Sequence, residues 1–125
     1  MNISQIKSNL KMENLYFPNC SIARNCSISE DEMNVDLQKS IDKIEDHTYN
    51  VTLQVSISKA DLDLIVIASA KFTYESDDYS REENIVNANT IAIIFPFVRS
   101  QVSLMTTQPG MSPIVLPPIN TANLK

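Results

Sequence analysis

A chain of 125 residues, 43% of them hydrophobic, is long enough for one domain with a single core. Its single glycine excludes the glycine-rich phosphate loops and dinucleotide fingerprints of nucleotide-binding proteins. The net charge of −5 and the scattered basic residues argue against a nucleic-acid partner, and no apolar run is long enough to span a bilayer, so we expect a soluble, cytoplasmic protein.

Two strands are predicted in the first part of the chain. The first runs from about residue 6 to residue 17, and the dipeptide Pro18-Asn19 ends it, because proline cannot donate a ladder hydrogen bond. The second spans about residues 33–45, where apolar residues occupy alternate positions from Met33 onward. Alternation of this period predicts strands with one apolar face.

Two more strands are predicted at about residues 48–58 and 62–75. In both, apolar and polar residues alternate, so one face belongs to the core and the other faces water. Ile65 and Ile67 interrupt the polar row of the last strand. A partly apolar outer face predicts that a helix or another subunit covers the second side of the sheet.

The segments around these strands offer no catalytic or metal site. The only histidine, His47, is predicted in a turn between two strands, and the acid-rich segment 75–83 in a solvated loop. Cys20 and Cys26 do not have the spacing of metal ligands. We therefore expect no enzyme activity, no metal and no other cofactor, which leaves binding as the function.

One helix is predicted from about residue 90 to residue 107, with Asn89 or Thr90 as its cap. Its apolar residues recur at three- and four-residue spacing and extend well beyond one face. Such a helix needs cover on more than one side. Pro96 lies beyond the first turn and predicts a kink.

The last third of the chain is almost uncharged, because residues 85–124 hold a single formal charge, Arg99. The helix is followed there by an apolar, proline-rich loop at 109–120. Loops normally lie on the surface and are polar, so an apolar loop predicts an interface or a groove. Beside Pro96, the rings of Phe95 and Phe97 either both fill the core, or the kink turns one of them into the groove.

Several segments resemble SecB, the bacterial export chaperone. The sequences Ile-Ile-Phe-Pro-Phe-Val-Arg at 93–99 and Leu-Pro-Pro-Ile-Asn at 116–120 are similar to the start of its long helix and to the loop that follows. Weaker similarity covers Gln-Ile-Lys at 5–7, Phe-Pro-Asn at 17–19 and the strand at 47–58. The likeness extends over nearly the whole chain, so we expect a single SecB-like domain at residues 1–125.

The resemblance implies an α+β fold, with a four-stranded antiparallel sheet and one long kinked helix. It implies a homo-oligomer, a tetramer in preference to a dimer. It also implies an ATP-independent chaperone, or holdase, that binds unfolded polypeptides in apolar grooves and can serve protein export. The rival interpretation is a dedicated interaction module with one specific partner. Composition cannot separate the two, because a groove and a subunit interface are equally apolar.

Two departures from SecB bear on its partners. In SecB a second helix and an acidic tail follow the loop and engage SecA, whereas this sequence stops at Lys125, so we expect the second helix to be missing or truncated. Acidic positions on the SecB sheet that dock SecA correspond to Tyr16 and Ile67. These departures weigh against SecA and leave an antitoxin, the partner of some SecB-like proteins, as an open alternative.

Two sets of residues are predicted to bind. The set expected to contact clients combines strand-exit aromatics with apolar residues of the helix and the loop: Tyr16, Phe17, Phe95, Phe97, Met105, Met111, Ile114 and Leu116. The set expected at the subunit interface combines the outward isoleucines of the last strand with the helix stripe: Ile65, Ile67, Ile91, Ile94, Val98 and Val102.

Overall fold

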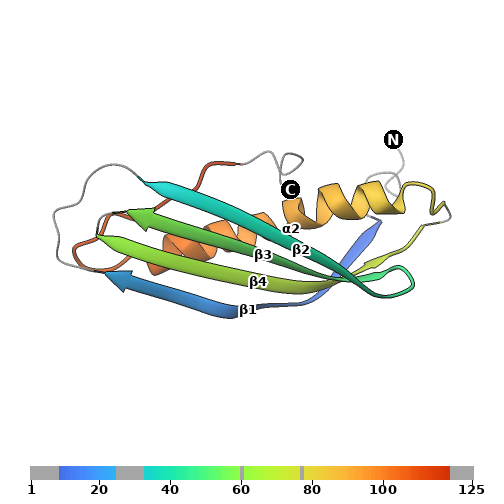
Figure 1. Cartoon of the computed structure of the whole chain (residues 1–125), viewed down its shortest axis with the longest axis horizontal. Coiled ribbons are helices and arrows are strands. Elements are labelled where there is room, and N and C mark those ends of the chain that lie inside the picture. The colour runs from blue at the N-terminus through green and yellow to red at the C-terminus, as the bar shows by residue number, and fades with distance from the viewer. Residues whose placement is uncertain (1–8, 25–32, 60, 77, 119–125) are drawn as a thin grey trace.

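The computed structural model, which describes residues 9–24, 33–59, 61–76 and 78–118, contains one antiparallel sheet with a long helix along it (Figure 1). The predicted α+β fold of four antiparallel strands and one long helix is confirmed. The elements are, in chain order, β1 (Leu10–Arg24), β2 (Asn34–Glu45), β3 (Thr48–Lys59), β4 (Leu62–Tyr74) and α2 (Glu82–Met105).

The strands lie in the order β1-β4-β3-β2, so β1 and β2 form the two edges of the sheet. Strands β2, β3 and β4 pair with their sequence neighbours, whereas β1 pairs with the distant β4. Helix α2 contacts β4, β3 and β1. We call the sheet face under α2 the inner face and the opposite face the outer face.

Strand β1 does not end at Pro18, as the sequence predicts, but continues to Arg24. Its pairing with β4 shifts register twice, between Glu13 and Tyr16 and between Tyr16 and Asn19, and Asn14 has a φ of 57°. An edge strand with bulges tolerates a proline, because the missing N–H interrupts only one ladder. Residues 6–8 of the predicted strand lie outside the described residues.

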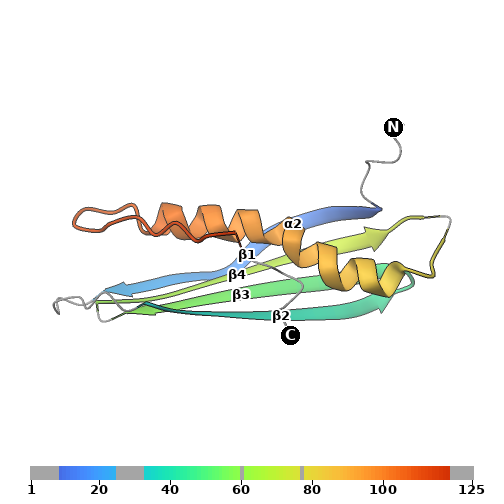
Figure 2. The same ribbon diagram turned by 90° about the horizontal axis from the view of Figure 1, so that it is seen from above.

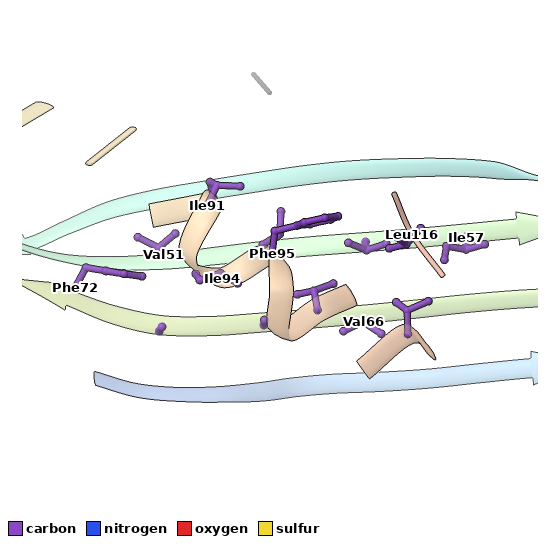
Figure 3. Close-up of a cluster of buried hydrophobic side chains, with 14 of the residues drawn as sticks. Val51, Ile57, Val66, Phe72, Ile91, Ile94, Phe95 and Leu116 are labelled. Carbon is purple, nitrogen blue, oxygen red and sulfur yellow. The ribbon is translucent and has the colours of Figure 1, made fainter. Parts of the chain in front are cut away.

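The core lies between the inner face and α2, as Figure 3 shows for Val51, Phe72 and Ile94. The alternation predicted for the two central strands is confirmed. Their inner rows are buried from end to end, with the β3 residues Val51, Leu53, Val55 and Ile57 and the β4 residues Leu62, Leu64, Val66, Ala68, Ala70, Phe72 and Tyr74.

Helix α2 begins at Glu82, well before the predicted start, and ends at Met105. Glu82 and Glu83 occupy its first turn, where negative charge is favourable against the helix dipole. Thr90 is not a cap but an interior residue, whose hydroxyl donates to the Val86 carbonyl at 2.6 Å. The acid-rich segment therefore forms both a loop and the start of the helix.

The axis of α2 changes direction near its middle, where Pro96 lacks the N–H that an α-helix requires (Figure 2). One side of the helix packs on the sheet through Ile91, Ile94, Val98 and Val102. By length and composition alone α2 could also cross a membrane, but a core helix meets the same criteria. Its position on the sheet is that of a core helix.

Candidate functional site

Two hydroxyl side chains hold the loop after α2 against the last turns of the helix. Ser103 Oγ donates to the Ile114 carbonyl at 2.9 Å, and Thr106 Oγ1 accepts from the Ile114 N–H at 2.8 Å. Figure 2 shows this segment running back beside the helix. It contains no further helix up to residue 118, and residues 119–120 of the predicted loop lie outside the described part.

The extended backbone of this loop sends successive side chains in opposite directions. Ile114 and Leu116 are buried in the core, whereas Val115 between them is 66% exposed. The apolar loop is therefore part core and part surface. Because Ile114 and Leu116 anchor it, the exposed Val115 is held at a fixed place beside the helix.

A shallow groove of about 560 Å³ lies between α2 and this loop. Apolar walls are formed by Pro96, Leu104 and Val115, and Leu104 is 69% exposed. The remaining lining residues are polar or charged: Arg99, Ser100, Ser103 and Thr107. We call this feature the helix–loop groove.

The far end of the loop is attached to β1 through Arg24. Its guanidinium donates to the carbonyls of Pro109 and Gly110 at 3.1 and 3.2 Å. Gly110 has a φ of +77°, a conformation in which other residues are strained. The only glycine of the chain thus lets the backbone turn from the helix into the groove wall.

The predicted client-binding residues do not form one surface. Phe95, Ile114 and Leu116 belong to the core, and Met105 and Met111 are half-buried against it. Of the helix and loop residues in this set, Phe97 alone is well exposed, at 44%. The structure thus answers the question left open at the kink: Phe95 packs inward and Phe97 points outward.

Tyr16 and Phe17 were predicted to line the same groove, but they lie on opposite faces of the sheet. Tyr16 pairs with Ser69 of the outer row and is exposed, whereas Phe17 packs against the core. The reason is the pleat of the strand, which turns consecutive side chains to opposite sides. Tyr16 and Ile67 do lie near each other on the outer face. Tyr16 pairs with Ser69, which is two residues from Ile67 in β4 and lies on the same face.

The predicted interface set also divides. Ile91, Ile94, Val98 and Val102 have no exposed surface in the single chain, so they are excluded as direct contacts to a second subunit. Their stripe covers the chain's own sheet. Ile65 and Ile67 are half-buried on the outer face and stay available for such a contact.

Leu104 and Val115 were not predicted as groove residues, and a polar cluster at the other end of α2 was not predicted either. In this cluster the buried Glu82 carboxylate contacts His47 Nδ1 at 2.5 Å and accepts a short hydrogen bond from the Tyr49 hydroxyl. Tyr79 stacks on the His47 ring, with centroids 4.1 Å apart. His47 does lie in the predicted turn, with a φ of 61° that is unusual for a residue other than glycine.

The cluster sets the protonation of its members. Burial favours the neutral acid of Glu82, but hydrogen bonds from Tyr49 and His47, with the charges of His47 and Lys43, outweigh it and hold the pKa of Glu82 below its usual value. Burial and the Glu82 carboxylate raise the pKa of Tyr49 to about 12. This cluster fastens the start of α2 to the β2–β3 turn.

Within the described ranges, no three His, Cys, Asp or Glu side chains come close enough to hold a metal ion. The helix–loop groove offers hydroxyls, one guanidinium and apolar walls, which suit recognition of a polypeptide better than bond-making chemistry.

Comparisons with known proteins show the family of the chain. Residues 5–124 match the family described as preprotein translocase subunit SecB. The chain is 24% identical over 98 residues to an uncharacterised protein of Methanocaldococcus jannaschii, a match that takes in 74% of this chain and 63% of that protein. The chain thus spans less than two thirds of the length of this curated relative.

Two solved structures share the fold. A SecB-like chaperone of Mycobacterium tuberculosis, in complex with a ChAD peptide from the HigA1 antitoxin, superposes with a TM-score of 0.72 at 12% identity, over 89% of this chain and 91% of that one. A protein of unknown function from Streptococcus agalactiae gives a TM-score of 0.54 at 11% identity, over 86% and 96% of the two chains. At such low identity these matches show the fold alone.

Proposed function

The chain belongs to the SecB family, and from this premise we propose that it is an ATP-independent holdase whose helix–loop groove binds apolar segments of non-native polypeptides. One observation carries the proposal: Leu104 and Val115, both about two-thirds exposed, face the same groove from two elements that hydrogen bonds hold together. Exposed apolar surface with a polar rim is a common feature of interaction sites. A cytoplasmic location accords with clients that have not yet folded.

The expected affinity for one segment is modest. Full burial of a side chain such as Leu104 or Val115 contributes roughly 1.5 to 3 kcal/mol. Association and ordering of the segment cost a large part of that sum. One groove should therefore bind a single segment only at roughly millimolar concentrations, and tight holding of a long client requires several grooves in one assembly.

The holdase is tested by diluting a denatured, aggregation-prone protein into buffer with and without the chaperone, and without ATP. We expect the wild-type protein to suppress turbidity at near-stoichiometric ratios. Leu104→Asp should weaken suppression at least about tenfold, because covering the groove would then bury an unpaired carboxylate. Ile44→Asp is the matched control, since Ile44 is 55% exposed but lies at the end of β2 outside the groove.

A second candidate is a chaperone dedicated to one antitoxin. It is favoured by the solved SecB-like chaperone whose structure contains an antitoxin peptide. In that case turbidity stays unchanged, and one specific protein co-purifies with the wild type but not with Leu104→Asp. Coupling to SecA and a role in export are lesser alternatives. Tyr16 and Ile67, which correspond to the acidic positions of SecB that dock SecA, are neutral and lie together on the outer face.

We also propose that the chain assembles into a homo-oligomer, a tetramer in preference to a dimer. Residues 84–98 of α2 hold no charged residue, and the outward positions among them include Ala88, Ala92 and Phe97. An uncharged outward side is unusual for a helix in contact with water. A second candidate surface lies around Ile65 and Ile67, with Asp36 and Asp63 beside Ile65.

Light scattering should report about 28 or 56 kDa, two or four times the chain mass of 14.0 kDa. Ala92→Glu should lower this mass if the helix forms the interface, and Ile67→Glu should lower it if the outer face does. A wild-type mass of 14.0 kDa at micromolar concentration would refute assembly.

A further inference from the structure

The backbone of Ile114 is held at two points by side chains at the end of α2. Ser103 Oγ donates to the Ile114 carbonyl at 2.9 Å, and Thr106 Oγ1 accepts from the Ile114 N–H at 2.8 Å. The Thr106 hydroxyl itself donates to the Val102 carbonyl at 2.8 Å, which leaves its lone pairs for the loop. We call Ser103 and Thr106 the hydroxyl clip. The clip takes the place of the neighbouring strand with which an extended segment would otherwise pair.

Burial and the hydroxyl clip constrain the loop in different ways. Burial of Ile114 and Leu116 decides which side of the loop faces the core, because side chains alternate along extended backbone. It sets the position of the loop along α2 only loosely, since the hydrophobic effect is non-directional. Hydrogen bonds have a preferred distance and angle, so the clip fixes that position. Pro113 has no N–H, and a shift of the loop that brought it to Thr106 would break the clip.

Each of the two residues joined by the Ser103 hydrogen bond is followed directly by a wall of the helix–loop groove. Leu104 follows Ser103 on the helix, and Val115 follows Ile114 on the loop. The clip therefore sets how far apart the two exposed walls lie. Walls that are already in place need no ordering when a client arrives, which removes part of the entropic cost of binding.

We propose that Ser103 and Thr106 are positioning residues for client binding, which hold Val115 across the groove from Leu104 so that one client side chain contacts both walls. The clip acts through Val115 rather than by bonding to the client, since both hydroxyls are engaged within the chain. This role rests on the proposed function, because it requires the groove to bind polypeptides. Loss of the clip should lower the affinity for clients even when the fold is intact.

The test compares Thr106→Val with Thr90→Val as the matched control. Both changes keep the shape of a buried threonine in α2 and remove a hydroxyl that donates to the carbonyl four residues earlier, but Thr106 alone of the two also accepts from Ile114. Fluorescence anisotropy measures the binding of reduced, carboxymethylated α-lactalbumin, a permanently unfolded protein. Thr106→Val should weaken binding at least about fivefold, whereas Thr90→Val and Thr106→Ser should stay within about twofold of the wild type.

A double-mutant cycle separates positioning from a merely structural role. Val115→Ala should weaken binding about threefold in the wild-type chain and less than about 1.5-fold in Thr106→Val, where Val115 has lost its fixed place. Hydrogen exchange of the Ile114 amide, followed by NMR, should be slow in the wild type and fast in Thr106→Val, with an unchanged circular dichroism spectrum. Ser103→Ala, at a half-buried position, removes the other half of the clip and should give the same cycle if Thr106→Val does not fold.

Independent effects of the clip and Val115 substitutions would overturn the positioning role and leave the holdase standing. An unchanged affinity of Thr106→Val would do the same. If Thr106→Val instead lowers the mass in solution by light scattering, the hydroxyl acts through assembly and the inference is wrong. If the unfolded protein does not bind the wild type at all, the holdase and the positioning role both fail.

Discussion

Replacement of Phe95 by alanine should lower the free energy of unfolding by about 3 to 5 kcal/mol, the cost of removing a large aromatic side chain from a packed core. Phe95 is only 6% exposed and belongs to the same buried cluster as Leu116, as Figure 3 shows. Because Leu116 anchors the loop, the cavity should also loosen the groove wall. Chemical denaturation monitored by circular dichroism measures the loss.

Phe97→Ala is the matched control, since it removes the same ring two residues later on the outward side of α2. Its ring is 44% exposed, so the stability should change by less than about 1 kcal/mol. Client binding or assembly should weaken instead, because Phe97 adds apolar surface beside the groove. Equal losses of stability in both variants would contradict the assignment of the two rings to opposite sides of the kink.

Much of the fold could be predicted because the central strands have one face in the core and one toward water. Val51 to Ile57 and Leu62 to Tyr74 therefore alternate in the sequence as they do in space. The start of α2 could not be predicted in this way, because Glu82 and Glu83 have the composition of a solvated loop. Their placement depends on contacts with His47 and Tyr49, more than thirty residues away in the chain.

Only the location of the helix–loop groove could be predicted from the sequence. An apolar helix and an apolar loop do meet in a groove, but composition does not show which side chains point outward. Ile91 and Ile94 cover the chain's own sheet, and an interface with another subunit would require the same residue types. The pleat of an extended chain was the signal left unused: it separates Tyr16 from Phe17 and turns Val115 away from its neighbours.

Loss of the Glu82 carboxylate should have the largest effect among the polar residues. Glu82→Gln keeps the shape but removes the charge from a buried acceptor that contacts His47 and Tyr49. We expect a loss of about 1 to 3 kcal/mol. Glu83→Gln, at the exposed neighbouring position, is the control and should change little. Tyr49→Phe combined with Glu82→Gln should lose less than the sum of the single variants, because both weaken the same contact between Tyr49 and residue 82.

The same cluster should make stability fall at both ends of the pH range. The pKa of Glu82 is lower in the folded chain than its ordinary value of 4.5, so its stabilising effect is complete above that value and is lost as the pH falls through the folded pKa. For Tyr49 the sign is opposite: its pKa is raised from 10.0 to about 12, so its contribution is complete below pH 10.0 and is lost as the pH rises toward 12. Ultraviolet titration should find that Tyr49 ionises late, and in Glu82→Gln this late step should move toward the ordinary value. A late step that is unchanged in Glu82→Gln would show that the carboxylate does not hold the hydroxyl, and the start of α2 would then depend on apolar packing alone.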